Sequence, residues 1–395
     1  MFKSKSIIVN SKKLFVVFIC CILLLFSLSA CMKNGYNAIE SQKTTENDTI
    51  SDGNETTDTE EGGDIDISPE DLAQATIGFP SFAYRFALNE EDLESESFDG
   101  IDKIEYNGEK INIWCKLTAG GYSEIKIGIR VFINGIIQSL FVANETTNMI
   151  TTVIEKNESE TIKLTFIPNI GNKGDTMELC FDLSSQPDII KDENESYRFY
   201  DDGSAPVGNV KLIMNADSSN IAEKEICDNY SNLSVSKVNE LIYQSYATDG
   251  DTGETNQYLD NIEIGIYQNI DDYIYIDETD KVICTNYHIR TTASENTDLT
   301  LNLHGKPGKY RVSFLLNGKV QRVFDGKGFA DVTVESNMQT ELKIFIDTME
   351  LSKNNKVYIF VYEIADEFNE DNQTIRTAVY PLIITDALSD ANTKL

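Results

Sequence analysis

Histidine and tryptophan are nearly absent from this sequence of 395 residues, which contains two histidines and one tryptophan. Neither His288 nor His304 has a cysteine or histidine at ligand spacing, which argues against a zinc site. No Gly-x-Ser-x-Gly motif occurs, so nothing indicates a hydrolase of that kind. Catalysis by paired carboxylates stays open, because 65 acidic residues allow many pairs. We expect a protein that is not an enzyme and that uses no metal or cofactor.

Positive charge is also scarce. The chain has 33 basic and 65 acidic residues, and its formal net charge is −32. Such a surface repels nucleic acid and the headgroups of anionic lipids. Nucleic acid is therefore excluded as a partner, and any attachment to a membrane needs a means other than charge.

The first thirty residues have the three parts of an export signal. Four lysines with no acidic residue among them come first: Lys3, Lys5, Lys12 and Lys13. An apolar run of fifteen residues, Leu14 to Leu28, follows, and it is shorter than the roughly 20 residues that a spanning helix needs. Small residues and a thiol end the segment. The pattern predicts a signal peptide over residues 1–30.

The motif Leu28-Ser29-Ala30-Cys31 resembles the lipobox of bacterial lipoproteins. The resemblance implies that the Cys31 thiol is joined to diacylglycerol and that cleavage between Ala30 and Cys31 makes Cys31 the first residue. Two acyl chains give stable attachment where one gives marginal binding. The mature protein would carry 29 basic and 65 acidic residues, a net charge of −36. An uncleaved anchor or an ordinary secreted leader is the alternative.

Residues 31–75 form a polar, acidic segment, in which Glu, Asp, Thr, Ser, Asn and Gly dominate. Almost nothing here can be buried, so we expect a disordered tether. Ser68-Pro69-Glu70-Asp71 predicts the start of a short helix at its end. The order of lipid, spacer and folded body is similar to that of Gram-positive surface lipoproteins, and it predicts a location on the outer face of the cell membrane.

Beyond the tether, apolar residues alternate with polar ones, which is typical of strands with one buried face. Ile111, Ile113, Cys115 and Leu117 share one face, opposite Asn112, Trp114 and Lys116. Helical periodicity is clear in one place, at Val238, Leu241, Ile242 and Ser245 behind the capping candidate Ser236. We therefore expect an all-β protein with one short helix.

The chain also resembles itself. The segment Val131-Phe132-Ile133-Asn134-Gly135-Ile136-Ile137-Gln138 recurs as Phe314-Leu315-Leu316-Asn317-Gly318-Lys319-Val320-Gln321. Each Asn-Gly pair predicts a two-residue hairpin turn. Further on, Met177, Leu179 and Phe181 match Val357, Ile359 and Val361.

The repeat predicts two tandem antiparallel β-sandwiches that generally resemble immunoglobulin-like domains, without a motif that names a family. The expected divisions are a first sandwich at 76–217, a linker with the short helix at 218–254, a second sandwich at 255–387 and a C-terminal tail at 388–395.

Four cysteines remain beyond the lipid-bearing one: Cys115, Cys180, Cys227 and Cys284. Cys115 and Cys180 have the spacing of an intersheet disulfide, but alternation places Cys115 on the core face and Cys180 on the other. Free thiols are therefore favoured. Pairing of Cys227 with Cys284 stays open, because sequence alone does not assign it.

Candidate ligand-binding residues are aromatic. Tyr273 and Tyr275 share one strand face and could stack on a sugar, and Trp114 is predicted to face outward. Packing of the tyrosines against a neighbouring strand is the alternative. The segment from Asp249 to Glu254 departs from a calcium-binding loop of the EF-hand kind, because its fifth position has no oxygen ligand and its twelfth is Asp260 rather than glutamate. The prediction is a lipid-anchored surface protein that binds another protein in the envelope or outside the cell, with glycan binding as the alternative.

Overall fold

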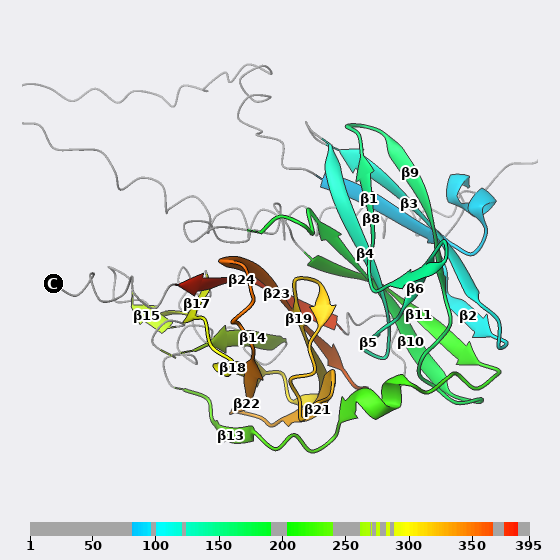
Figure 1. Cartoon of the computed structure of the whole chain (residues 1–395). Coiled ribbons are helices and arrows are strands. Elements are labelled where there is room, and N and C mark those ends of the chain that lie inside the picture. Colours follow the sequence, from blue (N-terminus) through cyan, green and yellow to red (C-terminus); the bar gives the residue numbers. More distant parts are fainter. Residues whose placement is uncertain are drawn as a thin grey trace, which may run out of the picture. The chain divides into compact units, whose positions relative to one another are not determined.

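The computed structural model describes residues 81–95, 100–120, 124–190, 204–239, 261–268, 270, 274–276, 282–284, 288–365 and 375–385. These residues belong to one compact unit, Pro69–Leu395. They form β-strands and two short 3₁₀ helices, η1 (Glu90–Glu94) and η2 (Ala222–Glu225), as the alternation predicted (Figure 1). Within the described ranges, no helix is both long and apolar enough to cross a membrane.

The first half of the body, residues 81–214, contains two sheets. Sheet A has the strand order β1 (Ser81–Ala87), β3 (Ile111–Gly120), β9 (Ser159–Phe166), β6 (Leu140–Val142) and β7 (Glu145–Thr147). Sheet B has the order β2 (Lys103–Tyr106), β11 (Ser204–Met214), β10 (Thr176–Ser185), β4 (Ile125–Ile133) and β5 (Ile136–Ile137), with β8 (Ile150–Ile154) also paired to β4.

The described residues of the second half, between 226 and 385, form two further sheets. Sheet C has the order β12 (Ile226–Cys227), β21 (Phe329–Val334), β19 (Gly308–Leu316), β23 (Asn354–Glu363), β24 (Ile375–Thr385) and β17 (Ile289–Thr292), with β20 (Lys319–Val320) paired to β19. Sheet D has the order β13 (Leu233–Lys237), β22 (Met338–Ile346), β18 (Thr297–Gly305) and β14 (Ile262–Tyr267). A separate pair joins β15 (Ile274–Ile276) to β16 (Val282–Cys284).

The two halves share a strand order. The series β2-β11-β10-β4 in sheet B corresponds to β17-β24-β23-β19 in sheet C, and β1-β3-β9 in sheet A corresponds to β14-β18-β22 in sheet D. Even the parallel pairing recurs, since β2 runs parallel to β11 and β17 runs parallel to β24. This correspondence agrees with the internal repeat of the sequence and extends it beyond the matched residues.

Both predicted hairpin turns are confirmed. Asn134 and Gly135 have φ values of 45° and 75° between β4 and β5, and Asn317 and Gly318 have values of 49° and 76° between β19 and β20. A two-residue turn with positive φ at both positions matches the twist of its strands, and Asn-Gly adopts it at low cost. The two turns fix equivalent points in the two halves.

The register of the strands corrects one part of the expected repeat. Leu179 lies opposite Ile133, and Val357 lies opposite Leu316. Because Ile133 and Leu316 each precede the Asn-Gly turn, Leu179 corresponds to Val357 rather than to Ile359. The sequence match was therefore displaced by two residues. A shift of two keeps every side chain on the same face of its strand, so spacing alone did not expose it.

Three buried clusters hold these sheets together. One cluster lies between sheets A and B and includes Ile113, Cys115 and Phe181. A second lies between sheets C and D and includes Leu301 and Phe314. The third, which we call the third core, joins the other faces of sheets B and C and comprises Phe132, Ile137, Cys180, Leu315, Tyr358, Phe360, Tyr362 and Ile375. Sheets B and C are thus covered on both faces.

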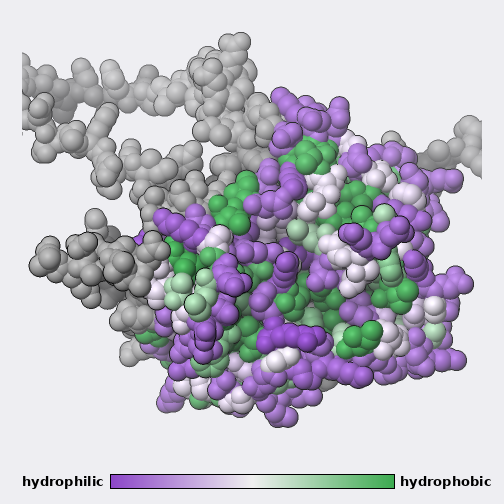
Figure 2. Space-filling view, in the orientation of Figure 1, coloured by the Kyte–Doolittle hydropathy of each residue, from purple (hydrophilic) through white to green (hydrophobic). Residues whose placement is uncertain are grey.

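The third core explains why some strands do not alternate. In β10 every residue after Thr176 is buried, and in β23 all residues from Asn355 to Tyr362 are buried. Strands covered on both faces have nearly continuous buried runs. The surface is different from these buried strands: on the face that Figure 2 shows, apolar residues are dispersed among hydrophilic ones.

The segment predicted to link the sandwiches contributes two strands to the second half. β12 pairs with β21, and β13 pairs with β22. Ser236, the expected cap of a helix, lies in β13 opposite Gln339. The helix therefore does not begin at Ser236, because this serine belongs to a sheet edge. Val238 and Asn239, which follow it, are not helical, and the rest of the expected helix, from residue 240 onward, lies outside the described residues.

Candidate functional site

Trp114 is the one predicted ligand residue whose side chain the structure describes. It lies in β3 on the face opposite the core residues Ile113 and Cys115, as the alternation predicted, and its side chain is half-buried. The cover comes from η1, which packs against β1 and β3. Leu93 of η1 is buried, and Arg85 Nη1 donates hydrogen bonds to the carbonyls of Leu93 and Ser95, each at 2.9 Å.

A hollow lies beside Trp114, with a volume of about 590 Å³. Its wall contains Thr161 and Asn89 as well as the acidic residues of η1. Two cations adjoin it. Lys116 pairs with Glu94 at 2.6 Å, and the Lys163 ammonium lies 5.3 Å from the centre of the Trp114 ring. An aromatic wall with carboxylate, amide and hydroxyl groups can bind a ligand that has both an apolar face and hydrogen-bonding groups.

The other predicted site residues lie outside what the structure describes. This holds for the motif from Leu28 to Cys31, for Tyr273, for the acidic segment from Asp249 to Glu254, and for the side chain of Tyr275, whose backbone lies in β15. Their roles remain predictions. Among the described residues, no group of three or more His, Cys, Asp or Glu is arranged to hold a metal ion.

The cysteines occupy the faces that the alternation predicted. Cys115 lies in the cluster between sheets A and B, whereas Cys180 lies in the third core. Cys115, Cys180 and Cys227 are free thiols, and the side chain of Cys284 lies outside the described residues. Burial raises the pKa of Cys115 to about 12. Burial, together with the charges of Glu178 and Asp182, raises the pKa of Cys180 well above its ordinary value. Both thiols are therefore protonated and poor nucleophiles at neutral pH.

His304 is buried in β18 and does not resemble a metal ligand. Its Nδ1 lies 2.8 Å from Asn302 Oδ1. Burial lowers the pKa of His304 to about 4, so the ring is neutral at pH 7. The side chain belongs to a polar network on the face of sheet D that turns away from the core, in which Tyr267 donates to Glu341 at 2.9 Å.

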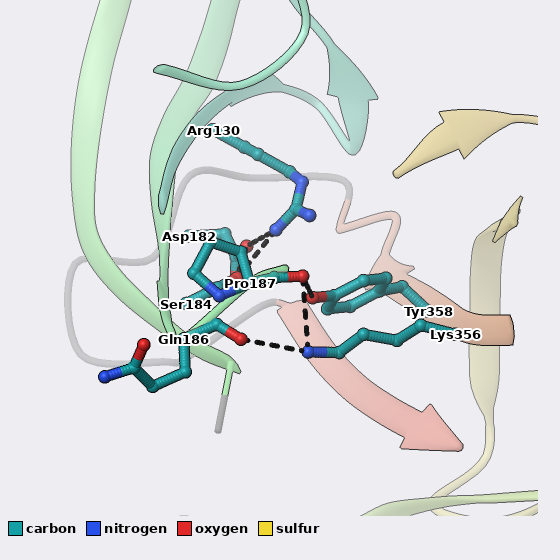
Figure 3. Close-up of polar contacts among 7 residues, drawn as sticks. All are labelled: Arg130, Asp182, Ser184, Gln186, Pro187, Lys356 and Tyr358. Carbon is teal, nitrogen blue, oxygen red and sulfur yellow. Dashed lines mark hydrogen bonds and ion pairs between the residues drawn. The ribbon is translucent and has the colours of Figure 1, made fainter. Parts of the chain in front are cut away.

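A buried polar cluster lies at the third core, and sequence reasoning missed it (Figure 3). Arg130 of β4 is fully buried, and its Nη1 contacts Asp182 Oδ2 and Ser184 Oγ, each at 2.7 Å. The guanidinium carbon lies 4.5 Å from the ring centre of Tyr358 and 5.6 Å from that of Phe360, both in β23 of the other half. An ion pair of the first half therefore packs against aromatic rings of the second.

Lys356 of β23 makes the complementary contact. Its Nζ lies 3.4 Å from the carbonyl oxygens of Gln186 and Pro187, and the Tyr358 hydroxyl lies 3.4 Å from the same Pro187 oxygen (Figure 3). Only about 1% of the Lys356 residue is exposed. A buried charge is costly unless polar groups satisfy it. The carbonyls just beyond the end of β10 thus take the place of water around this ammonium group.

A third set of contacts joins the halves near the Asn134-Gly135 turn. Tyr362 donates to Glu178 Oε2 at 3.0 Å, and Arg311 Nη1 donates to the Asn134 carbonyl at 2.9 Å. Arg311 is held by Asp331 through two hydrogen bonds of 2.7 Å. Burial and the charge of Glu178 raise the pKa of Tyr362, so its hydroxyl stays protonated as a donor.

One sequence signal could have indicated the third core. The run from Val357 to Tyr362 is apolar or aromatic at every position, which is typical of a strand buried on both faces. Nothing local marks Arg130 as a buried ion-pair residue, because its partners are brought together only by the pairing of β4 with β10.

Comparisons with known proteins give the chain no family. No family model and no curated protein matches it. A PapD-like domain of human CEP192 is 8% identical, with a TM-score of 0.20, and the match covers 43% of this chain and 99% of that domain. Red sea bream transglutaminase is 6% identical, with a TM-score of 0.18 and coverage of 80% and 33%. CBD12 from CALX1.2 is 8% identical, with a TM-score of 0.17 and coverage of 76% and 99%. At these scores, the likenesses carry no argument about family, ligand or activity.

Proposed function

We propose that this chain is a non-enzymatic interaction protein, attached by lipid at Cys31 to the outer face of the cell membrane. The leader and the Leu28-Ser29-Ala30-Cys31 motif support the attachment, and the all-β, immunoglobulin-like fold is compatible with an interaction role. The observation that carries the role is the third core, because it joins sheet B to sheet C, and thereby the two halves, into one body whose exposed faces are held in place. The partner is a protein of the envelope or of the cell's surroundings.

Capture on intact cells tests this role. A photo-crosslinking amino acid is introduced at the exposed Asn89 beside the hollow, or at Glu155 in an exposed turn as the matched control, and captured proteins are identified by mass spectrometry. A defined protein captured from the Asn89 position alone supports an interaction through the hollow. Absence of any defined neighbour from these and further surface positions would refute the role.

Binding of glycan is the second candidate function, and the hollow beside Trp114 is the observation that favours it. An indole ring can stack on the apolar face of a sugar, while Asn89, Thr161 and the carboxylates of η1 can bind its hydroxyl groups. Polysaccharide pull-down that is lost on Trp114→Ala would support this role. Loss on Tyr273→Ala with Tyr275→Ala instead would move the sugar site to the tyrosines, and no binding by the unaltered protein would remove the glycan role.

A further inference from the structure

Sheets B and C meet through the same face in both halves. The residues that sheet B contributes to the third core are Phe132, Ile137 and Cys180. By the common register, their counterparts in the second half are Leu315, Val320 and Tyr358. Leu315 and Tyr358 are buried in the same cluster, and Val320 packs against it. Each of these three residues of the first half therefore packs in a cluster that its own counterpart in the second half also contacts.

Glu178 and Lys356 occupy equivalent positions. The backbone N–H of Glu178 donates to Asn134 Oδ1 at 2.7 Å, and that of Lys356 donates to Asn317 Oδ1 at 2.9 Å. In return, the N–H of Asn134 donates to the Glu178 carbonyl, and the N–H of Asn317 donates to the Lys356 carbonyl, both at 2.8 Å. The same exchange of hydrogen bonds beside the Asn-Gly turn fixes the correspondence independently of the sequence match.

The contacts that these two residues make are reciprocal to within two or three residues. Glu178 accepts from Tyr362, at the far end of β23. Lys356 donates to Gln186 and Pro187, just beyond the far end of β10. By the same register, Tyr362 corresponds to Ser184, which lies two residues before Gln186. In each half, the end of the sheet beside the Asn-Gly turn therefore contacts the opposite end of the other half's sheet.

Such reciprocity is the mark of an isologous interface, in which one patch binds its own equivalent across a twofold axis. We infer that the faces of sheets B and C that meet in the third core are docking surfaces for a second copy of this fold, and that the chain is a dimer joined in tandem. The partner for each face is a sandwich of the same kind, here supplied by the same polypeptide. The attraction comes from the third core and its buried polar contacts, and the covalent link between the halves is not required for it.

Cutting the folded chain tests the inference. A specific protease site is inserted between Glu223 and Lys224, both exposed in η2, within the otherwise complete chain. After cleavage in buffer without denaturant, the two fragments are separated by size-exclusion chromatography. We expect them to elute together, at the volume of the uncut chain, in equal amounts. Elution of the fragments as separate species would overturn the inference, because the faces would then need the link.

A pair of variants assigns the association to the third core. Phe132→Asp places a charge in this cluster, while Val153→Asp changes an exposed residue of β8 in the same sheet. After cleavage, the Phe132→Asp fragments should separate and the Val153→Asp fragments should stay together. Fragments of Phe132→Asp that remain together as firmly as those of the control would overturn the assignment. If Phe132→Asp does not fold before cleavage, co-elution of the unaltered fragments still decides the inference.

Discussion

Gly135 and Gly318 provide a matched test of the contact between the halves, because they occupy the same position of the same turn. Their φ values are 75° and 76°, so alanine at either one costs roughly 1–2 kcal/mol for the left-handed backbone alone. The surroundings differ. A methyl carbon at Gly135 would lie 2.5 Å from Cβ and 2.7 Å from Cγ of Tyr362, whereas a methyl at Gly318 meets nothing within 4 Å.

The clash at Gly135 is with atoms close to the Tyr362 backbone, which a rotation of the ring cannot move away. Overpacking of this kind costs about 1–3 kcal/mol. Gly135→Ala should therefore lower the free energy of unfolding by about 1–3 kcal/mol more than Gly318→Ala, measured by urea unfolding of the two variants and the unaltered chain. Since Tyr362 belongs to the other half, the excess reports on contact between the halves. Equal losses for the two variants would refute the packing of Tyr362 on this turn.

Three further predictions concern buried charge, acid stability and attachment. Arg130→Met should lower the free energy of unfolding by about 3–5 kcal/mol, because it leaves Asp182 buried without its cation, and adding Asp182→Leu should recover most of that loss. Stability should fall as the pH drops below about 6.5 towards 4, by about 3 kcal/mol from His304 alone, because the unfolded chain binds a proton that the buried, neutral ring does not. Cys31→Ala should leave an unprocessed precursor that takes up no radiolabelled palmitate.

Each of these has a control. Lys103→Met removes the exposed ion pair with Glu105 and should cost less than about 1 kcal/mol, so an equal cost for Arg130→Met would contradict the account of the buried pair. His304→Asn should flatten the pH dependence between 6.5 and 4, and an unchanged slope would mean that other groups carry it. Maturation and membrane retention of Cys31→Ala would remove the lipid anchor from the proposal.

The sequence predicted features that depend on neighbours along the chain. Alternation placed Cys115 and Cys180 on opposite faces, and Asn134-Gly135 and Asn317-Gly318 specified their turns through backbone preference alone. The all-β class followed from the same alternation. The displaced match of Leu179 with Ile359 shows the limit of this reasoning, because a shift of two residues changes the partner while preserving the face.

Features that depend on distant segments were not predicted. Trp114 was correctly assigned to the outward face, but its hollow requires η1, twenty to twenty-four residues earlier, to pack over the sheet. Ser236 has the chemistry of a helix cap and is nevertheless in an edge strand, since pairing with β22 outweighs local preference. The burial of Arg130 arises only when two sheets meet, and no spacing along the sequence encodes that meeting.

The equivalent positions of Glu178 and Lys356 hold opposite charges, and Arg130 has Ser313 as its counterpart. Two separate, identical subunits are encoded by one gene, so every substitution appears on both sides of their contact at once. Here each side can change alone, which allows an acid on one flank and a base on the other, and a guanidinium stacked on rings that its own half lacks. Because the two halves are joined in one chain, the two sides of their contact can have different residues. One outer face can likewise acquire a ligand without any change in the other.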